Sequence, residues 1–387
     1  MSNPVDNIPY GKHSVDDDDV AAVVDVLQNH FLTQGSIVPQ FEKALATYTG
    51  AKYATAVNSA TSGLHVACLT LGVGQGDRVW TSPISFVASA NCALYCGASI
   101  DFVDIDSDTR NISIAALERK LAIANKANLL PKVIVVVHFS GLSCQMQEIA
   151  ALCQQYNVRI IEDAAHGLGG RYQHHKIGSC EYADLAVLSF HPVKSITSAE
   201  GGAVMTNNEV LFERSKLFAK HGVTRDPNQM QGLSDGPWYY QQVELGYNYR
   251  LSDLHAALGL SQLNKLDGFI EKRQILAQRY HDLLKHLPIT LPSMENADTS
   301  AWHVYMVELK AHNRSVIYDA LIERGIGVNV HYIPIHLQPY FKKLGFSEGD
   351  FPNAENYYQN ALTLPLFPSL TADEQDRVVQ ALNEVLA

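Results

Sequence analysis

Short apolar runs alternate with longer amphipathic stretches along the first half of the chain. The run VIVVV at 133–137 has no polar alternation, which is typical of a strand covered by helices on both faces. Such runs, separated by helical patterns, favour parallel strands joined by crossover helices. The sequence therefore predicts an α/β fold with one wide, mostly parallel sheet of seven strands. The expected strands lie at 53–58, 78–81, 99–103, 132–138, 158–162, 183–189 and 202–206.

The pattern changes after residue 250. Pro288, Pro292 and the polar stretch 293–300 indicate a join between elements. We expect a large domain at 1–250, whose N-terminal segment lines a cleft, and a smaller α/β domain at 251–387. The elements expected in the second domain are a helix at 251–284, a segment at 301–309, a helix at 315–324, a strand near 327–332 and a final helix from about 371.

Composition narrows the class of protein. The chain has 387 residues, of which 47% are hydrophobic and 18% charged, so it can bury a substantial core. Its net charge of −11, without a cluster of Lys and Arg, argues against binding to a nucleic-acid backbone. The first ten residues lack a signal sequence, and the longest strongly apolar run, at 133–137, is too short to cross a bilayer. We expect a cytoplasmic protein that binds neither membrane nor nucleic acid.

No metal site is predicted. The aspartate run at 16–19 fits the first turn of a helix capped by Ser14 better than a metal site. His174 and His175 are adjacent, so they point apart on a strand and are expected at the tip of a surface hairpin. The cysteines form no CxxC pair and are expected to be reduced thiols. They are Cys68, Cys92, Cys96, Cys144, Cys153 and Cys180.

The segment SFHPVK at 189–194 lies between two strand-like runs and is followed by a Gly-rich turn. A lysine held there in a low-dielectric pocket has a lowered pKa and can form a Schiff base with an aldehyde. Asp163 ends an earlier strand and can keep the ring nitrogen of pyridoxal phosphate protonated. Alternatively, Lys194 is a surface lysine and Asp163 caps the next helix. The pattern favours a pyridoxal phosphate site, with the carboxyl ends of the strands bringing these residues together.

The segment SATSG at 59–63 follows a strand and opens a helix. The backbone N–H groups and hydroxyls of Ala60, Thr61 and Ser62 can receive a phosphate at the positive end of that helix, although Ser and Thr are also ordinary helix caps. The sequence GLGG at 167–170 lacks the spacing of a dinucleotide-binding loop, and no Gly-Lys-Ser/Thr sequence of a nucleoside triphosphatase is present.

Five segments together resemble the DegT/DnrJ/EryC1/StrS family of fold-type I pyridoxal phosphate aminotransferases, which act on nucleotide-linked keto sugars. The resemblance covers nearly the whole chain, and it implies this fold, cofactor and activity. Some relatives carry histidine at the position of Lys194 and catalyse other chemistry, so Lys194 favours amino transfer. The segments are LTQG at 32–35, NSATSGL at 58–64, IEDAAH at 161–166, the stretch 189–202 and GYNYRL at 246–251.

The resemblance also implies roles for individual residues. Lys194 would be the Schiff-base lysine, Asp163 the partner of the pyridine nitrogen, and Ser189 part of the phosphate site. His166 would orient the phenolic oxygen of the cofactor or pack below it. Phe86 would stack on the pyridine face, although an aromatic residue here can equally belong to the core. Asn248 would reach the cofactor phosphate of the partner subunit, which implies a homodimer with shared sites. Residues matching the sugar-nucleotide cleft are Tyr10, Thr33, Arg250, His331 and Tyr332.

Within the family, the segments 82–88, 189–194 and 330–334 look most like the branch of the pseudaminic acid pathway. That branch usually has PITT after the lysine, whereas this chain has SITS at 195–198. The expected substrate is a UDP-linked 2-acetamido-2,6-dideoxy-β-L-arabino-4-hexulose, with L-glutamate as amino donor and 2-oxoglutarate as co-product. The alternatives are a family member that makes a D-series 4-amino sugar or an amino-arabinose precursor, and a non-catalytic regulator. A regulator would be expected to lose Lys194 or Asp163, or to gain a basic DNA-reading segment.

Overall fold

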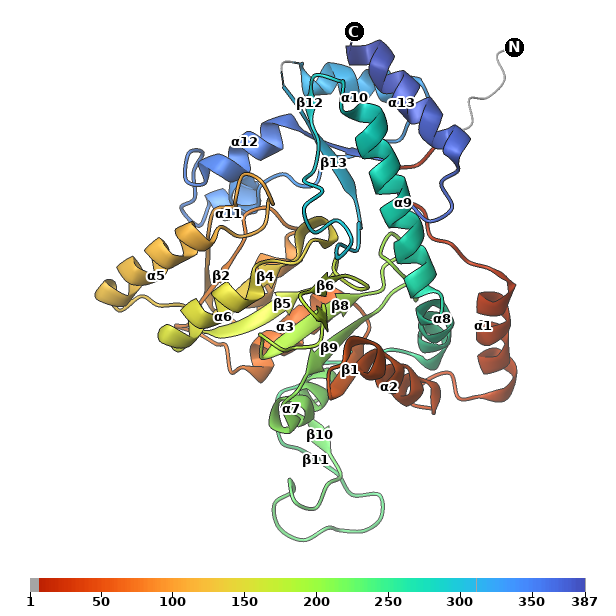
Figure 1. Ribbon diagram of the computed structural model, residues 1–387. Helices are drawn as coiled ribbons and strands as arrows, with labels where there is room; N and C mark the ends of the chain where they lie inside the picture. Colours follow the sequence, from red (N-terminus) through yellow and green to blue (C-terminus); the bar gives the residue numbers. More distant parts are fainter. Residues whose placement is uncertain (1–6, 311, 387) are drawn as a thin grey trace.

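A seven-stranded sheet forms the centre of the molecule in the computed structural model, which describes residues 7–310 and 312–386 (Figure 1). The strand order is β1-β9-β8-β5-β4-β2-β3, and β9 runs antiparallel to β1 and β8 while the other neighbours are parallel. All seven predicted strands are present, and the mostly parallel sheet is confirmed. Their bounds are β1 Tyr53–Val57, β2 Arg78–Thr81, β3 Ser99–Phe102, β4 Val133–Val137, β5 Arg159–Asp163, β8 Leu185–Ser189 and β9 Gly202–Thr206.

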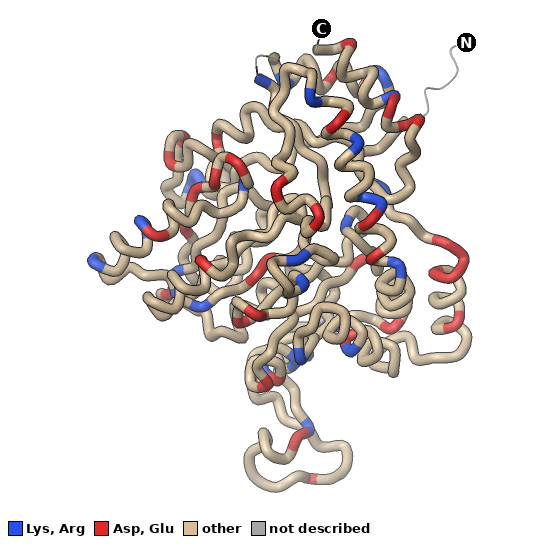
Figure 2. Tube along the Cα trace, viewed as in Figure 1, with Lys and Arg blue, Asp and Glu red and all other residues tan. Residues whose placement is uncertain are grey.

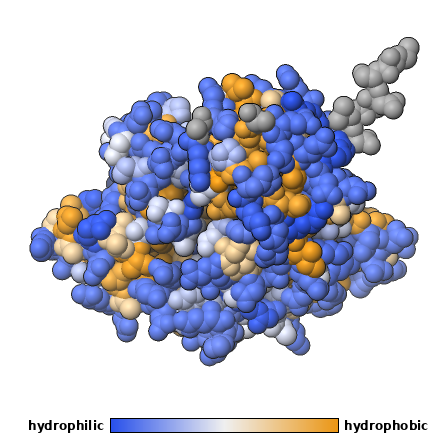
Figure 3. All heavy atoms as spheres, turned by 45° about the horizontal axis from the view of Figure 1, so that its top comes forward, coloured by the Kyte–Doolittle hydropathy of each residue, from blue (hydrophilic) through white to orange (hydrophobic). Residues whose placement is uncertain are grey.

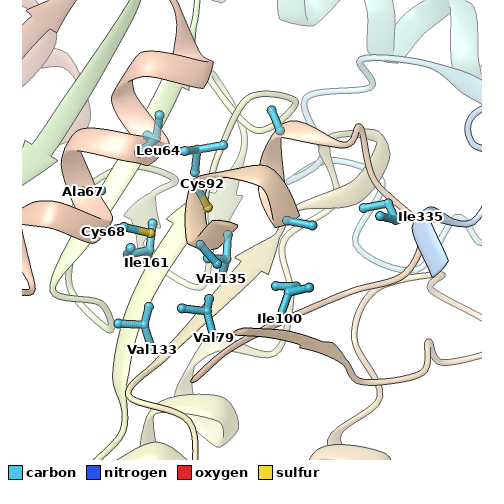
Figure 4. Close-up of a cluster of buried hydrophobic side chains, with 14 of the residues drawn as sticks. Leu64, Ala67, Cys68, Val79, Cys92, Ile100, Val133, Val135, Ile161 and Ile335 are labelled. Carbon is cyan, nitrogen blue, oxygen red and sulfur yellow. The ribbon is translucent and has the colours of Figure 1, made fainter. Parts of the chain in front are cut away.

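Helices cover both faces of this sheet, as the unbroken apolar run in β4 predicts. Val133 and Val135 pack into one core cluster, whereas Ile134 and Val136 pack into another on the opposite face. Figure 4 shows the first cluster, in which strand residues meet helix residues such as Leu64. The helices of the first cluster are α3 Ala60–Thr70, α4 Ala88–Tyr95 and α7 Glu209–Ala219; α5 Ile114–Ala127 and α6 Met146–Gln155 cover the other face, and α2 Ile37–Thr49 lies over β1.

The long helix expected at 251–284 is two helices, α8 Asp253–Leu263 and α9 Leu266–Leu284. The turn between them places the amine of Lys265 against the carboxylates of Asp16 and Asp19, so a contact with helix α1, Asp17–Asn29, accompanies the break. The cap of α1 is also not the one predicted. Asp16, rather than Ser14, accepts the N–H of Asp19, while the Asp19 side chain accepts the N–H of Asp16.

A smaller antiparallel sheet follows, formed by β12 Ile289–Thr290, β13 Tyr305–Leu309 and β14 Ala361–Leu364. It packs with α9, α10 Arg314–Glu323 and α13 Ala372–Leu386. The strand predicted near 327–332 is wrong, because this stretch makes a single isolated bridge, Asn329 to Thr363, and Ile326 just before it makes another, to Ile8. Gly327 lies so close to the backbone of Ile8 that the segment is fixed by packing rather than by a ladder. The remaining elements of this region are α11 Pro339–Lys342, α12 Pro352–Asn360 and the short 3-10 helix Ile335–Leu337.

Each sheet has a core that includes residues from a distant part of the chain. Ile8 belongs to the core of the smaller sheet, whereas Phe341 and Phe351, from the C-terminal part of the chain, pack into the core of the larger one. The domain boundary at 250 stays a prediction. The expected hairpin is present, formed by β6 Arg171–Tyr172 and β7 His175–Lys176, with His174 in its turn and His175 as the first residue of β7. A second short 3-10 helix, Phe139–Gly141, follows β4.

An arm projects from the body below α7 (Figure 1), starting at β10 Val223–Thr224 and returning at β11 Gln241–Gln242. Elsewhere Lys and Arg are spread among Asp and Glu (Figure 2), and the face in Figure 3 shows separate apolar patches among polar residues. Within the described ranges, no helix has the length and apolar character needed to span a membrane.

Candidate active site

A cavity of about 470 Å³ opens at the carboxyl ends of the central strands. It lies between the ends of β5 and β8, the first residues of α3 and the irregular segment 329–332. Ligands of parallel sheets bind at this edge, and the volume suits a cofactor together with part of a substrate. The cavity therefore gathers residues from the whole length of the chain.

Lys194 projects into this cavity from the turn that follows β8, where its backbone N–H donates to the carbonyl of His191 at 2.8 Å. Within the described residues, Nζ of Lys194 has no hydrogen-bond acceptor. Enclosure by protein lowers the pKa of Lys194 to about 8, and the negative charge of Asp163 opposes that shift. A larger share of the amine is thus neutral, and nucleophilic, near neutral pH.

Asp163 ends β5 and is buried, yet no Lys or Arg of the described chain forms an ion pair with it. Its Oδ2 accepts a hydrogen bond from Oγ of Ser89 at 2.6 Å, and Oδ1 accepts from the N–H of Ala165 at 3.2 Å. A buried carboxylate is stable when a cation pairs with it. The carboxylate is therefore suited to a protonated ring nitrogen.

The first residues of helix α3 line the cavity. Ser59 caps the helix and accepts the N–H of Ser62 at 3.1 Å, which leaves the N–H groups of Ala60 and Thr61 free toward the cavity. The hydroxyl of Ser189 also faces this space. Free N–H groups at a helix N-terminus bind phosphate. Ser62 itself is buried, and its hydroxyl lies 3.0 Å from that of Ser59 rather than in the cavity lining.

Two histidines in ring contact, with their planes tilted by 41°, line the cavity. The ring of His166 lies 4.2 Å from that of His303, and its Nε2 is 3.1 Å from the hydroxyl of Tyr332. Burial, followed by the charge of Lys194, lowers the pKa of His166 well below the usual range, and burial does the same for the pKa of His303. Both rings are therefore neutral. Their Nδ1 atoms are buried without a partner in the described chain, so a bound group can supply one.

Aromatic side chains form the outer wall of the cavity. Phe86 is 59% exposed, and its ring lies 6.4 Å from that of Tyr332. Tyr10 packs 5.6 Å from His331, whose Nδ1 is 2.8 Å from Oγ1 of Thr363. Burial lowers the pKa of His331 to about 4, with the charge of Lys194 acting in the same direction, so this ring is also neutral. The open faces suit flat rings of a ligand.

The structure thus brings together ten of the fourteen site residues predicted from the sequence. Thr33 instead lies exposed between α1 and α2, Asn248 bridges Lys220 at the end of α7, and Arg250 bridges Val57 of β1. These three, like Ser62, lie outside the cavity lining of their own chain. The ten that line it are Tyr10, Ala60, Thr61, Phe86, Asp163, His166, Ser189, Lys194, His331 and Tyr332.

Other residues that line the cavity were not predicted from the sequence. Ser85 and Ser89 lie at the start of an ordinary helical pattern, and Glu200 lies in the turn that precedes β9. His303 interrupts the apolar run AWHVY at 301–305. This polar residue within an apolar run is the one sequence feature that could have indicated a role in the site. In the described residues, no group of three or more His, Cys, Asp or Glu side chains is arranged to hold a metal.

A lysine and a buried carboxylate that share one cavity with a helix N-terminus, on a mostly parallel sheet, are typical of a pyridoxal phosphate enzyme of fold type I. The chain belongs to the DegT/DnrJ/EryC1/StrS aminotransferase family, whose family model matches residues 13–383. It is a pyridoxal phosphate-dependent aminotransferase. The fold, cofactor and reaction class predicted from the sequence are therefore confirmed.

Several named proteins are similar to this chain over nearly their whole length. UDP-4-amino-4,6-dideoxy-N-acetyl-beta-L-altrosamine transaminase of Campylobacter jejuni is 38% identical over 383 residues, covering 98% of this chain and 97% of its own length. Spore coat polysaccharide biosynthesis protein SpsC of Bacillus subtilis is 36% identical over 386 residues, covering 98% and 97%. The structure of Helicobacter pylori PseC, an aminotransferase involved in the biosynthesis of pseudoaminic acid, matches with a TM-score of 0.89 at 32% identity, covering 98% of this chain and 99% of that one.

Proposed function

We propose that this aminotransferase converts a UDP-linked 2-acetamido-2,6-dideoxy-β-L-arabino-4-hexulose into UDP-4-amino-4,6-dideoxy-N-acetyl-β-L-altrosamine, with L-glutamate as donor. The 38% identity to the Campylobacter jejuni transaminase, spread over nearly both whole chains, supports this substrate. The cavity that Lys194 and Asp163 both line carries the proposed chemistry, because a bound cofactor could meet the amine and the carboxylate there.

Pyridoxal phosphate, when bound, supplies an aldehyde that takes up amino groups and a ring that withdraws electrons. Asp163 would hold the proton on the ring nitrogen, and its own position is fixed by Ser89. The free N–H groups of Ala60 and Thr61, with the hydroxyl of Ser189, would hold the phosphate. These contacts would hold the cofactor in the cavity that Lys194 also lines.

Lys194 would hold the aldehyde carbon in the resting enzyme and then act as general base and acid. Its neutral amine would remove the proton from the α-carbon of L-glutamate, and its protonated form would deliver a proton to C4 of the sugar. The pKa of about 8 suits both directions, since the amine is neither fully protonated nor fully neutral near that pH. The neutral rings of His166, His303 and His331 add no positive charge that would depress it further.

We propose that the enzyme is a homodimer with shared sites. Among the described cavity residues Lys194 is the one Lys or Arg, whereas the cofactor phosphate, the nucleotide diphosphate and glutamate are anions. A second subunit could supply the missing cations, and Asn248 and Arg250 lie outside the cavity of their own chain. The arm between β10 and β11 exposes Leu233 (94%) and Trp238 (69%), as expected for a segment that packs on another subunit.

Complementation between subunits tests the shared site. Lys194→Ala and Asn248→Ala should each abolish or strongly reduce turnover. Mixed and reassembled, they should restore up to about a quarter of wild-type activity, because half of the dimers carry one intact site. The control is Lys194→Ala alone, mixed with itself and reassembled in the same way, which should show no recovery. No recovery with Asn248→Ala, despite exchange of subunits shown by mass spectrometry, would place both residues in one subunit's site.

The absorption spectrum of the purified holoenzyme tests the substrate. L-Glutamate should bleach the visible band of the lysine-bound cofactor, and the UDP-linked L-arabino 4-keto sugar should restore it. The second candidate is an aminotransferase that acts on another nucleotide-4-keto sugar. The 36% identity to SpsC, which is close to the 38% identity to the transaminase, supports this candidate. Restoration by the D-series epimer but not by the L-arabino sugar would select that candidate.

A further inference from the structure

The cavity residue His331 is held in place by the smaller sheet and by α12. Its Nδ1 lies 2.8 Å from Oγ1 of Thr363, which belongs to β14. The backbones of Asn329 and Thr363 exchange two hydrogen bonds, of 3.2 and 2.7 Å. The hydroxyl of Tyr357 in α12 donates to the carbonyl of His331 at 2.7 Å. Both the main chain and the imidazole of His331 are therefore fixed.

Thr363 is the polar residue of β14, whose sequence is ALTL. Leu362 and Leu364 pack into the core of the smaller sheet, so the alternation of a strand directs Thr363 to the opposite face. Thr363 is only 1% exposed, so water does not reach its hydroxyl freely. In the described part of the chain, His331 is the one residue that forms a hydrogen bond with this hydroxyl. The hydroxyl proton therefore has a single acceptor, Nδ1 of His331.

This contact determines which ring nitrogen of His331 carries a proton. If Nδ1 were protonated, it would donate to Thr363, and the hydroxyl proton of Thr363 would be buried without an acceptor. Such unpaired buried donors are rare because they lose their hydrogen bonds to water. Burial, with the charge of Lys194, lowers the pKa of His331 to about 4, so the ring is neutral and has one N–H. With Nδ1 as the acceptor, that N–H is Nε2–H.

Nε2 is also the nitrogen of His331 that a ligand can reach. It has no hydrogen-bond partner among the described residues, and unlike Nδ1 of His166 it is not shielded by protein. The ring of His331 lines the cavity, with the ring of Tyr10 5.6 Å away. An N–H group donates a hydrogen bond and cannot accept one. It therefore suits an acceptor oxygen, which a keto-sugar nucleotide offers in its carbonyl and diphosphate groups.

We propose that Thr363 is a positioning residue that fixes His331 as a neutral donor, whose Nε2–H binds an oxygen of the keto-sugar nucleotide. In this form His331 takes no proton from the substrate, and Lys194 remains the group that moves protons. The contact with the sugar nucleotide rests on the proposed function, whereas the position of the proton on His331 does not.

Nuclear magnetic resonance of the wild-type holoenzyme tests the position of the proton. With histidine labelled by nitrogen-15, a long-range proton–nitrogen spectrum at neutral pH distinguishes protonated from unprotonated ring nitrogens. The signals of His331, identified by their loss in His331→Gln, should show a protonated Nε2 and an unprotonated Nδ1. A proton on Nδ1, or on both nitrogens, would overturn the proposal. Because this spectrum needs no substrate, failure of the substrate assignment leaves its result readable.

Steady-state kinetics test the positioning role of Thr363. Thr363→Val removes the hydroxyl at nearly constant volume. It should raise KM for the UDP-linked L-arabino 4-keto sugar by about threefold to tenfold, with a smaller change in kcat, because the lost contact acts on binding. Thr363→Ser keeps a hydroxyl and should bring KM back toward the wild-type value.

Thr290→Val is the matched control, because it makes the same change at an exposed threonine of β12 and should leave KM unchanged. The affinity of Thr363→Val for pyridoxal phosphate should equal that of wild type, which separates a local effect from a loss of fold. A wild-type KM in Thr363→Val, or an equal rise in Thr363→Ser, would overturn the positioning role. If wild type does not turn over this sugar, the proposed function fails, while the spectrum still decides where the proton lies.

Discussion

Ser89 donates a hydrogen bond of 2.6 Å from its Oγ to Oδ2 of Asp163, and this contact links the first turn of α4 to the end of β5. The hydroxyl of Ser85 lies 2.6 Å from that of Ser89 and extends the chain of polar groups, all of them buried. A carboxylate that must face a ring nitrogen needs a fixed orientation. Ser89 is therefore a positioning residue for Asp163.

Replacing Ser89 with Ala should weaken cofactor binding and turnover by about tenfold to a hundredfold, the worth of a hydrogen bond to a charged group. Equilibrium titration with pyridoxal phosphate measures the affinity, and circular dichroism checks the fold. Ser347→Ala makes the same change at an exposed serine and should have no effect. An unchanged affinity in Ser89→Ala would show that Asp163 is held by other contacts.

Lys194 should react as an amine with a pKa near 8 rather than 10.5. In the cofactor-free enzyme, the rate of reaction with pyridoxal phosphate should therefore rise with pH and level off above about 8, because the neutral amine is the nucleophile. Stopped-flow absorbance from pH 6 to 10 follows this reaction. A rate that still rises tenfold per pH unit at pH 9 would contradict the lowered pKa.

The same pKa predicts a stability effect. Because the folded value lies below the unfolded one, the unfolded chain binds more protons between pH 8 and 10.5, and Lys194 destabilises the cofactor-free protein below pH 8. Lys194→Met should stabilise that form by about 1–3 kcal/mol at pH 7, and the gain should vanish as the pH approaches 10.5. Urea unfolding of both proteins provides the measurement. Lys343→Met, at an exposed position, should show no such pH dependence.

The sequence predicted those parts of the molecule whose structure depends on neighbouring residues along the chain. The seven strands follow from apolar runs, and Lys194 and Asp163 from their places at strand ends. Ser89 and His303 reach the site only through packing of distant elements, and their own neighbourhoods look like an ordinary helix and an ordinary strand. Likewise, the break between α8 and α9 adjoins the contact of Lys265 with α1, which helical periodicity does not reveal.

Gly202 should tolerate no larger residue. A Cβ there would lie 2.7 Å from the backbone N of Ala60 and 2.8 Å from the carbonyl carbon of Ser59, at the start of α3, where we propose that the cofactor phosphate binds. Gly202→Ala should therefore destabilise the protein by about 1–3 kcal/mol and weaken cofactor binding. Gly268→Ala is the matched control, because it lies exposed in α9 with open space around it and should stabilise by about 0.5–1 kcal/mol. Equal unfolding midpoints for the two variants would contradict the close approach.

Among the substitutions considered, a change at Arg273 should lower the free energy of unfolding the most. It is buried in α9, and its Nη1 donates to the carbonyls of Trp302, His303 and Leu366 at 3.2, 3.1 and 2.9 Å. Burial lowers the pKa of Arg273 to about 10, so it stays charged at neutral pH. Arg273→Met would leave these buried carbonyls without a donor.

That loss should cost about 2–4 kcal/mol in the free energy of unfolding. The variant should also loosen the backbone that carries His303 against His166. Guanidinium unfolding measures the first effect, and the proton resonances of the two imidazoles report the second. Lys272→Met, one residue earlier and exposed, should change stability by less than about 0.5 kcal/mol. If Arg273→Met unfolds at the same denaturant concentration as Lys272→Met, the three carbonyl contacts do not stabilise the joined sheets.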